Sequence, residues 1–235
     1  MEEVKYLLFL RFSYSPCQVG GEFLFKEKVI MRKKVIKRMC FDAIFASLSL
    51  ILYVFGPKFP LPFLFPGFLD IQFSMLPILI VTFMLGPVDG LIVIVVRFFV
   101  KVFAFSSFTS PYGEMADVIY SVVVILSVSL VQYLLNKKEN VSGRRRFVTL
   151  LGTIICSWII GALLSNAFII PIYCLIMGKE TVYGMVAIFP FVNENNWLLY
   201  YFTLAIIPFN LILSSIVGVL TLSVDKHLLR FYNRI

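Results

Sequence analysis

Residues 68–101 contain two apolar runs joined by a short polar corner, and this pattern constrains the fold more than any other in the chain. The corner, residues 86–90, holds Pro87 between two glycines, so a helix is not expected to continue through it. Each run is about long enough to cross the ~30 Å hydrocarbon core of a bilayer. Arg97 and Lys101 lie in the second run, where they would be costly facing lipid. The sequence therefore predicts a helical hairpin surrounded by further membrane spans.

The composition of the whole chain agrees with a polytopic membrane protein. Of its 235 residues, 60% are hydrophobic and 14% are charged, whereas soluble domains are usually about 45–50% apolar and about 25% charged. The net charge of +8 could indicate a nucleic-acid partner. The basic residues, however, form blocks beside apolar runs, which is the usual pattern of cytoplasmic membrane loops. We therefore expect no nucleic acid among the partners.

The first thirty residues differ from the rest of the chain. Their apolar part is interrupted by Arg11 and is too short for a membrane span. Met31 opens a basic stretch directly before an apolar run, as a natural start would. We predict that residues 1–30 are a mis-assigned or flexible N-terminal extension and that residues 31–235 form a single membrane domain.

Hydropathy predicts that this domain is all-α, with six transmembrane helices. Besides the two runs of the hairpin, the spans are residues 40–55, 115–135, 147–170 and 197–224, with the fifth helix altered near Pro171. The proline-rich segment 56–68 is predicted to lie over the outer mouth of the bundle, and residues 178–196 form a loop. Basic blocks precede the first span, link the fourth and fifth, and follow the sixth. The positive-inside rule therefore predicts that both termini are cytoplasmic.

Polar residues at or within the outer halves of these spans are the candidates for a binding site. Buried polar groups in lipid are costly and tend to face a cavity or each other, so we expect a pocket that opens to the outside. Polar pairing between helices, or helix capping, is the alternative for any one of them. The aromatic candidates could instead belong to an interfacial belt. The candidate substrate-binding residues are Asp70, Gln72, Glu114, Asp117, Asn166, Trp197, Tyr201 and Asn210.

The sequence lacks the common motifs of catalysis and metal binding. It contains no HExxH, GxSxG or P-loop motif, and its four cysteines and one histidine are scattered, so no metal site is expected. We expect no enzyme activity and no cofactor, and any ATP would be used by a partner. In the first predicted span, Ala43, Ala46 and Ser47 provide a small-xxx-small spacing that permits close helix packing. They are the predicted partner interface, with internal packing as the alternative.

Four stretches of the sequence, taken together, resemble a known family. Residues 68–97, FLDIQFSMLPILIVTFMLGPVDGLIVIVVR, are similar to a long hairpin motif of the S components of energy-coupling-factor (ECF) vitamin transporters. Residues 113–116, GEMA, resemble the family's GELA motif, residues 166–173 its NxxxxIPxY motif, and residues 208–210 its PFN motif. The order and spacing agree from about residue 38 to residue 225, with the riboflavin-specific members as the nearest pattern.

The resemblance implies a function in vitamin import. It implies a six-helix subunit in the bacterial cell membrane that captures a water-soluble vitamin, with riboflavin favoured, on the outer side. The implied partners are a transmembrane T component, which would meet the first span, and two cytoplasmic ATPases. Asn166 and Asn210 would then form hydrogen bonds to the ligand.

Three departures from the riboflavin pattern leave the ligand open. Leu213 stands where that pattern has a lysine, Gln72 replaces an aspartate, and Asp117 replaces an asparagine. The alternative ligands are FMN, pantothenate, folate or a queuosine precursor. Two other functional classes are a stand-alone secondary carrier, for which we find no internal repeat, and a membrane-embedded enzyme.

Overall fold

The computed structural model describes residues 21–56, 59–60, 65–66, 69–71, 73–104, 111–138, 142–187 and 192–234. The chain divides into two units, Met1–Met39 and Cys40–Ile235. The described residues of the first unit form the beginning of helix α2, Gly21–Val54, which continues into the second unit. Helix α2 passes through Met31 without interruption, and residues 1–20 lie outside the described part of the chain. The N-terminal extension therefore stays a prediction, and the following paragraphs concern the second unit.

The predicted hairpin is present, but its first arm is shorter than expected. Helix α3, Met75–Met84, has 10 residues and rises only about 15 Å. The prediction that this run forms a helix long enough to cross the bilayer is therefore wrong. Helix α4, Pro87–Ala104, has 18 residues. A Cβ on Gly90 would lie 2.3 Å from Thr82 Oγ1 of α3, so the close approach of the two helices depends on this glycine.

The corner between α3 and α4 is also shorter than predicted. Gly86 has a φ angle of 119°, in the left-handed region that favours glycine. Pro87 then begins α4, where its missing N–H removes no helical hydrogen bond. Asp89 lies in the first turn of α4, where the helix dipole favours a carboxylate. The prediction of a non-helical corner as far as Gly90 is therefore wrong beyond Gly86.

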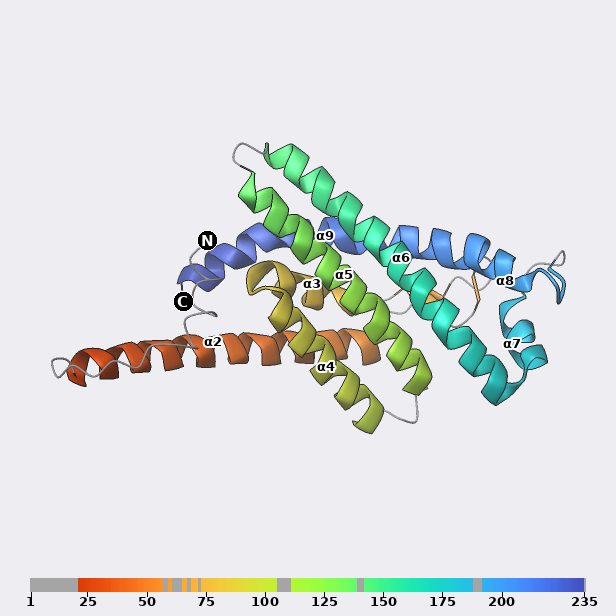
Figure 1. The fold of residues 1–235 in the computed structure, drawn as a ribbon, viewed down its shortest axis with the longest axis horizontal. Helices are drawn as coiled ribbons and strands as arrows, with labels where there is room; N and C mark the ends of the chain where they lie inside the picture. Colours follow the sequence, from red (N-terminus) through yellow and green to blue (C-terminus); the bar gives the residue numbers. More distant parts are fainter. Residues whose placement is uncertain are drawn as a thin grey trace. The chain divides into compact units, whose positions relative to one another are not determined.

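Helices α5, Pro111–Lys137, and α6, Gly143–Met177, run side by side in opposite directions (Figure 1). Both are longer than the predicted fourth and fifth spans and contain them. Pro171 lies inside α6, so the helix continues past the point where we expected it to change. It ends at Gly178, which has a φ angle of 87°. Helix α7, Lys179–Val186, follows directly, which corrects the prediction of a loop over that segment.

The sixth predicted span is one continuous helical segment with a π-helical turn near its start. It consists of α8, Trp197–Tyr200, the π segment η1, Tyr201–Ile206, and α9, Ile207–Arg234. Every fourth side chain is buried, at Trp197, Tyr201, Ala205, Phe209, Leu213, Val217 and Thr221. An α-helix has 3.6 residues per turn, so a strict spacing of four would gradually rotate around it. The wider turn of a π-helix reduces this drift at the start of the segment.

Contacts between α6 and α9 show that these helices are antiparallel. A Cβ on Gly218 would lie 2.8 Å from Leu151 Cδ1, whereas Trp158, further along α6, bonds to Asn210, which lies earlier in α9. The start of α6 and the end of α9 therefore lie at the same end of the bundle. The positive-inside argument requires their basic segments to share one side, and the side itself stays a prediction.

The proline-rich segment contributes one short strand, and no helix, in its described residues, and a second short strand follows it. Strand β1, Phe59–Pro60, pairs antiparallel with β2, Asp70–Ile71. Between them, Phe65 is only 1% exposed, and its ring meets the Phe209 ring edge-on at 5.3 Å between centroids. Phe65 therefore packs against α9 as a buried aromatic side chain.

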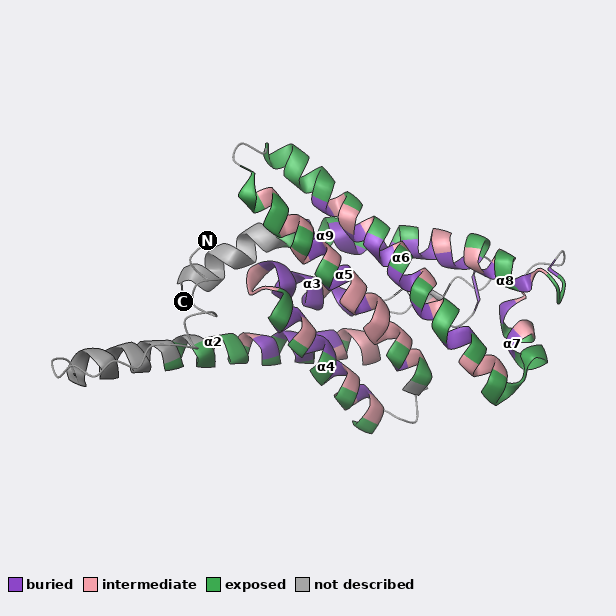
Figure 2. Ribbon diagram, in the orientation of Figure 1, coloured by how far each residue is buried: buried purple, intermediate pink, exposed green. Residues whose placement is uncertain are grey.

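Burial separates an inner helix from outer ones (Figure 2). Helix α3 is buried along most of its length, while α5 and α6 keep many exposed apolar side chains. Three of the described helical segments are long and apolar enough to cross a membrane: Tyr112–Lys137, Gly143–Met177 and Trp197–Val224. These features support a helical membrane protein, whereas the count of six spans and the location of the termini stay predictions.

Candidate functional site

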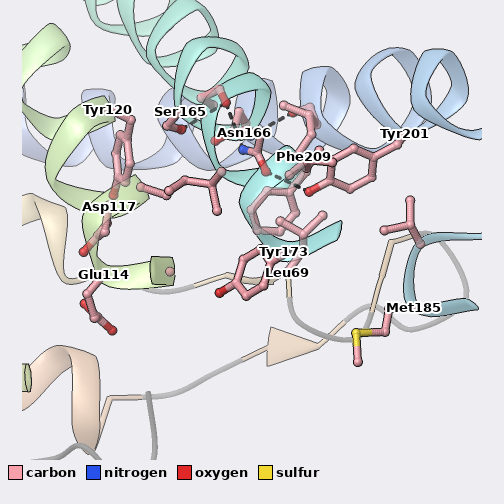
Figure 3. Close-up of a pocket in the computed structure, with 18 of the residues that line it drawn as sticks. Leu69, Glu114, Asp117, Tyr120, Ser165, Asn166, Tyr173, Met185, Tyr201 and Phe209 are labelled. Atoms are coloured by element: carbon pink, nitrogen blue, oxygen red, sulfur yellow. Dashed lines mark hydrogen bonds between the residues drawn. The ribbon is translucent and has the colours of Figure 1, made fainter. Parts of the chain in front are cut away.

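A cavity of about 560 Å³ lies between the helices of the second unit. Its volume falls within the roughly 300–1,000 Å³ that is usual for small-molecule sites. Side chains from α2, α4, α5, α6, α7, η1 and α9 line it, together with Leu69 next to β2. Figure 3 shows Glu114, Asp117 and Tyr120 along one helix and, apart from them, Asn166 beside Tyr201. The polar lining residues are Tyr53, Lys101, Glu114, Asp117, Tyr120, Ser165, Asn166, Tyr173, Tyr201 and Asn210.

Four charged side chains, which we call the ion cluster, pair at one side of this cavity: Arg97 and Lys101 of α4 with Glu114 and Asp117 of α5. All of them except Arg97 line the cavity. Arg97 pairs with Asp117, and Lys101 pairs with Glu114. Lys101 Nζ also lies 3.1 Å from Asp117 Oδ2. Both cations are buried, with Arg97 and Lys101 at 2% and 1% exposure. Two positive and two negative groups face each other, so the ion cluster carries no net charge.

Helix α2 and the start of α3 supply further partners for the ion cluster. Tyr53 Oη donates a hydrogen bond of 2.9 Å to Glu114. Arg97 donates to Ser49 Oγ at 3.3 Å and to the Ser74 carbonyl at 3.4 Å. These bonds matter because an unpaired charge inside a membrane protein is costly. The positions of Arg97 and Lys101 in the second run of the hairpin are thereby explained.

Two asparagine side chains contribute amides to the cavity. Asn166 Oδ1 accepts a hydrogen bond of 2.9 Å from Tyr201 Oη, drawn as a dashed line in Figure 3. Asn210 Oδ1 accepts one of 3.1 Å from Trp158 Nε1. Each amide combines a donor and an acceptor, so together they suit a neutral ligand with polar edges.

Aromatic rings supply much of the remaining wall. The Tyr120 and Trp158 rings lie 5.6 Å apart between centroids, and Phe209 contributes a third ring to the lining. Tyr173 lines the cavity near Gly113, where an added Cβ would lie 3.3 Å from Tyr173 Oη. Cavities with apolar and aromatic walls and a few placed polar groups are typical of sites for organic ligands.

A family model described as "ECF transporter, substrate-specific component" matches residues 37–224. The chain belongs to this family. The resemblance that the sequence motifs indicated is therefore confirmed. The protein is the S component of a transporter, and its family is one of substrate-binding components rather than of enzymes. Membership in this family also implies association with other ECF components.

Two further similarities agree with this assignment. The S component is 29% identical over 180 residues to the riboflavin transporter RibU of Staphylococcus aureus (strain TCH60), a match that covers 76% of this chain and 84% of that protein. Its fold is similar to a solved structure reported under "Structure and mechanism of the S component of a bacterial ECF transporter". That similarity has a TM-score of 0.57 and 24% identity, and it covers 83% of this chain and 96% of the other. The likeness indicates a shared membrane-helical fold.

The structure brings together five of the eight residues that we predicted to bind substrate. These five line the cavity of the S component: Glu114, Asp117, Asn166, Tyr201 and Asn210. Trp197 is buried but is absent from the lining residues. The side chain of Asp70 and the whole of Gln72 lie outside the described residues. Whether any of these residues contacts a ligand stays a prediction.

The predicted partner interface on α2 divides between two faces. Ala43 and Ser47 are exposed, and Ser47 Oγ donates to the Ala43 carbonyl at 2.8 Å. Ala46 is 5% exposed and belongs to the hydrophobic core. A partner that docks on this helix would therefore meet Ala43 and Ser47, while Ala46 supports the helix from within.

Sequence reasoning missed several residues of the lining. Lys101 carried a signal, because a charge within a membrane run usually marks a functional or paired site, but its partners could not be identified. Trp158 and Tyr53 lie in apolar runs and gave no signal that separates them from ordinary core residues. Leu213, the departure from the riboflavin pattern, also lines the cavity. Its apolar side chain means that the cavity gains no cation at this position.

Proposed function

We propose that this S component captures riboflavin on the outer side of the bacterial cell membrane. Import would then proceed in a complex with a transmembrane T component and two cytoplasmic ATPases, which use the ATP. The observation that carries the proposal is that Asn166 and Asn210, from two separate motifs, line one cavity in a chain related to a riboflavin transporter. Aromatic walls and two amides suit a planar ring system with polar edges.

The charge balance of the cavity supports a neutral vitamin over an anionic one. Lys101 is the only cation among the described residues that line the cavity, and it is already paired with Glu114 and Asp117. A phosphate or carboxylate on the ligand would thus have to approach two carboxylates without a free cation to compensate it. Riboflavin carries no such group, whereas FMN, pantothenate and folate do.

The position of the cavity supports an outward opening. Glu114 lies in the first turn of α5, and Lys137 lies in its last turn. The basic residues after Lys137 begin the cytoplasmic segment that the positive-inside rule predicts. Since the cavity is lined from the other end of α5, it lies in the half of the bundle that we assign to the outside.

A different neutral vitamin is the second candidate ligand. The observation in its favour is Leu213, which lines the cavity where the riboflavin pattern has a lysine. A lost cation removes a hydrogen-bond donor that would otherwise meet a ligand carbonyl. This candidate predicts the same family function and the same neutrality of the ligand but a different ring system.

The test is a riboflavin titration of the purified full-length chain. Trp158 lines the cavity, so bound flavin should quench tryptophan fluorescence in a saturable way, and the purified protein should carry yellow flavin. FMN, pantothenate and folate should compete poorly. Asn166→Ala and Asn210→Ala should weaken binding, whereas Asn195→Ala, at an exposed position outside the lining, should not. A colourless protein whose fluorescence is unaffected by riboflavin would contradict riboflavin as the ligand and leave the second candidate.

A further inference from the structure

The two amides of the cavity are held by the same arrangement of hydrogen bonds, used twice. Trp158 of α6 donates across to Asn210 of α9, and Tyr201 of η1 donates across to Asn166 of α6. Helix α6 and the segment formed by η1 and α9 therefore each contribute one aromatic donor and one amide. All four side chains line the cavity. Trp158 and Tyr201 are almost fully buried, at 1% and 4% exposure.

A second bond fixes which way each amide faces. Asn166 Nδ2 donates to the Ala162 carbonyl at 2.9 Å, and Asn210 Nδ2 donates to the Ile206 carbonyl at 2.8 Å. A backbone carbonyl can only accept and an indole N–H can only donate. Rotation of the Asn210 amide by a half-turn would therefore set acceptor against acceptor and donor against donor. For Asn166, the carbonyl of Ala162 imposes the same orientation.

The π segment fits this pairing. Along α6, Trp158 precedes Asn166 by eight residues, whereas along η1 and α9, Tyr201 precedes Asn210 by nine. The two helices are antiparallel, so both cross-links must span the same distance with unequal numbers of residues. The segment Tyr201–Ile206 is π-helical and lies between the two residues that bond across. It accommodates the additional residue, because a π-helix takes more residues for each turn.

We propose that Trp158 and Tyr201 are positioning residues that set the specificity of the site by fixing the orientation of Asn210 and Asn166. This rests on the proposed function only in that the cavity is the vitamin site. Beyond the bonds described, each amide keeps one N–H and one oxygen lone pair within the described part of the chain. Their fixed directions favour a ligand whose ring edge presents acceptors and donors together, as lactam and imide groups do. Among planar vitamins, the class selected is one with a pyrimidinedione or similar edge.

Double-mutant cycles on riboflavin binding test this pairing. Trp158→Phe and Tyr201→Phe each remove one donor and keep an aromatic ring, and each should weaken binding roughly two- to twelvefold, the range of one lost hydrogen bond. In an Asn210→Ala background, Trp158→Phe should have less than a twofold effect, whereas in an Asn166→Ala background it should keep its full effect. Tyr201→Phe should show the opposite dependence. Equal effects of Trp158→Phe in all backgrounds would overturn the proposal.

A matched variant separates positioning from general packing. Tyr183→Phe removes a hydroxyl that donates to the Val192 carbonyl at 2.9 Å, and Tyr183 is not among the lining residues. This variant loses one hydrogen bond as Tyr201→Phe does, and it should leave the affinity for riboflavin within about twofold. Midpoints of thermal unfolding without ligand identify any variant that is simply unfolded.

A ligand-free measurement tests the pairing even if riboflavin is not the ligand. The indole N–H signals of the two tryptophans can be assigned in an NMR spectrum with Trp197→Phe. Asn210→Ala should shift the Trp158 signal, and Asn166→Ala should leave it unchanged. A shift of equal size in both variants, or in neither, would refute the paired arrangement. Failure of wild-type riboflavin binding with the expected NMR result would instead contradict the proposed ligand and preserve the pairing.

Discussion

Lys101 Nζ of α4 lies 3.4 Å from the centre of the Tyr53 ring of α2, and the same ring carries the hydroxyl that donates to Glu114. Tyr53 therefore contacts both members of one ion pair, the cation through its ring face and the carboxylate through its hydroxyl. Contact between an ammonium group and an aromatic face is attractive, and more so where water is excluded. This arrangement joins α2, α4 and α5 at one side of the cavity.

Removal of Lys101 should destabilise the protein strongly. Lys101→Met leaves Glu114 and Asp117 with Arg97 as their remaining cation, and breaking a buried pair costs about 3–5 kcal/mol. Thermal unfolding in detergent should show a lowered midpoint. Lys101→Met combined with Glu114→Gln restores the charge balance and should recover part of the loss. Lys137→Met, at an exposed position in the last turn of α5, is the control. No recovery in the double variant would mean that charge balance is not what Lys101 contributes.

A methyl group on Gly161 should disturb the contact between α5 and α6. A Cβ at this position would lie 3.1 Å from both Cα and O of Tyr120. These are backbone atoms, which cannot move independently of the helix. Gly161→Ala should therefore lower the free energy of unfolding by about 1–3 kcal/mol, the usual cost of overpacking. Gly152→Ala in the same helix has open space around it and should be neutral or stabilising, by up to about 1 kcal/mol. Equal midpoints for the two variants would contradict this account.

A lysine at position 213 should change the charge preference of the site. Leu213→Lys adds a cation to the lining of a cavity whose charges are balanced, so affinity for FMN relative to riboflavin should rise roughly tenfold or more, the value of a charge-assisted hydrogen bond. Competition titrations measure this ratio. Leu213→Met keeps the size and lack of charge and should leave the ratio unchanged. If the lysine variant keeps the wild-type ratio, the charge of the cavity does not decide between the two ligands.

Loss of the Phe65 ring should loosen Phe209, the lining residue that it packs against. Phe65→Ala removes the edge-on contact with Phe209, which itself lines the cavity. Ligand dissociation should accelerate. The increase is roughly tenfold if the contact contributes about 1.4 kcal/mol to retaining the ligand. Stopped-flow fluorescence after dilution or competition measures that rate. Phe103→Ala, at a ring that is 78% exposed, is the comparison and should leave the rate unchanged. An unchanged rate in Phe65→Ala would show that this ring does not retain the ligand.

The long apolar runs made part of this structure predictable from sequence. The helices that contain residues 115–135, 147–170 and 197–224 appear where hydropathy places them, because continuous apolar side chains and internally bonded backbone leave few alternatives in a membrane. The amides Asn166 and Asn210 were also recognisable, since polar groups in such runs must find partners or a cavity.

Other features depend on contacts that no local pattern encodes. The partners of Lys101 are one helix away in sequence, so its charge was visible but its pairing with Glu114 was not. Pro171 was expected to alter α6, yet the helix continues, because proline removes one backbone bond and tertiary packing can hold the remaining turns. The π segment has no sequence signature of its own and follows from matching two helices of unequal residue count. Helix α3 begins only at Met75, because the start of the predicted run forms β2 and pairs with β1, a contact that the apolar pattern does not encode.

The neutrality of the ion cluster has an electrical consequence. A charge that crosses the membrane field gains or loses about 2.3 kcal/mol per 100 mV. Arg97, Lys101, Glu114 and Asp117 sum to zero, and the proposed ligand adds nothing to that sum. If these four side chains and the proposed ligand moved together through the membrane field, their charges would contribute no net work against the voltage. The cost of import would then fall on the concentration gradient of the vitamin and on the ATPases, at any membrane potential that the cell maintains.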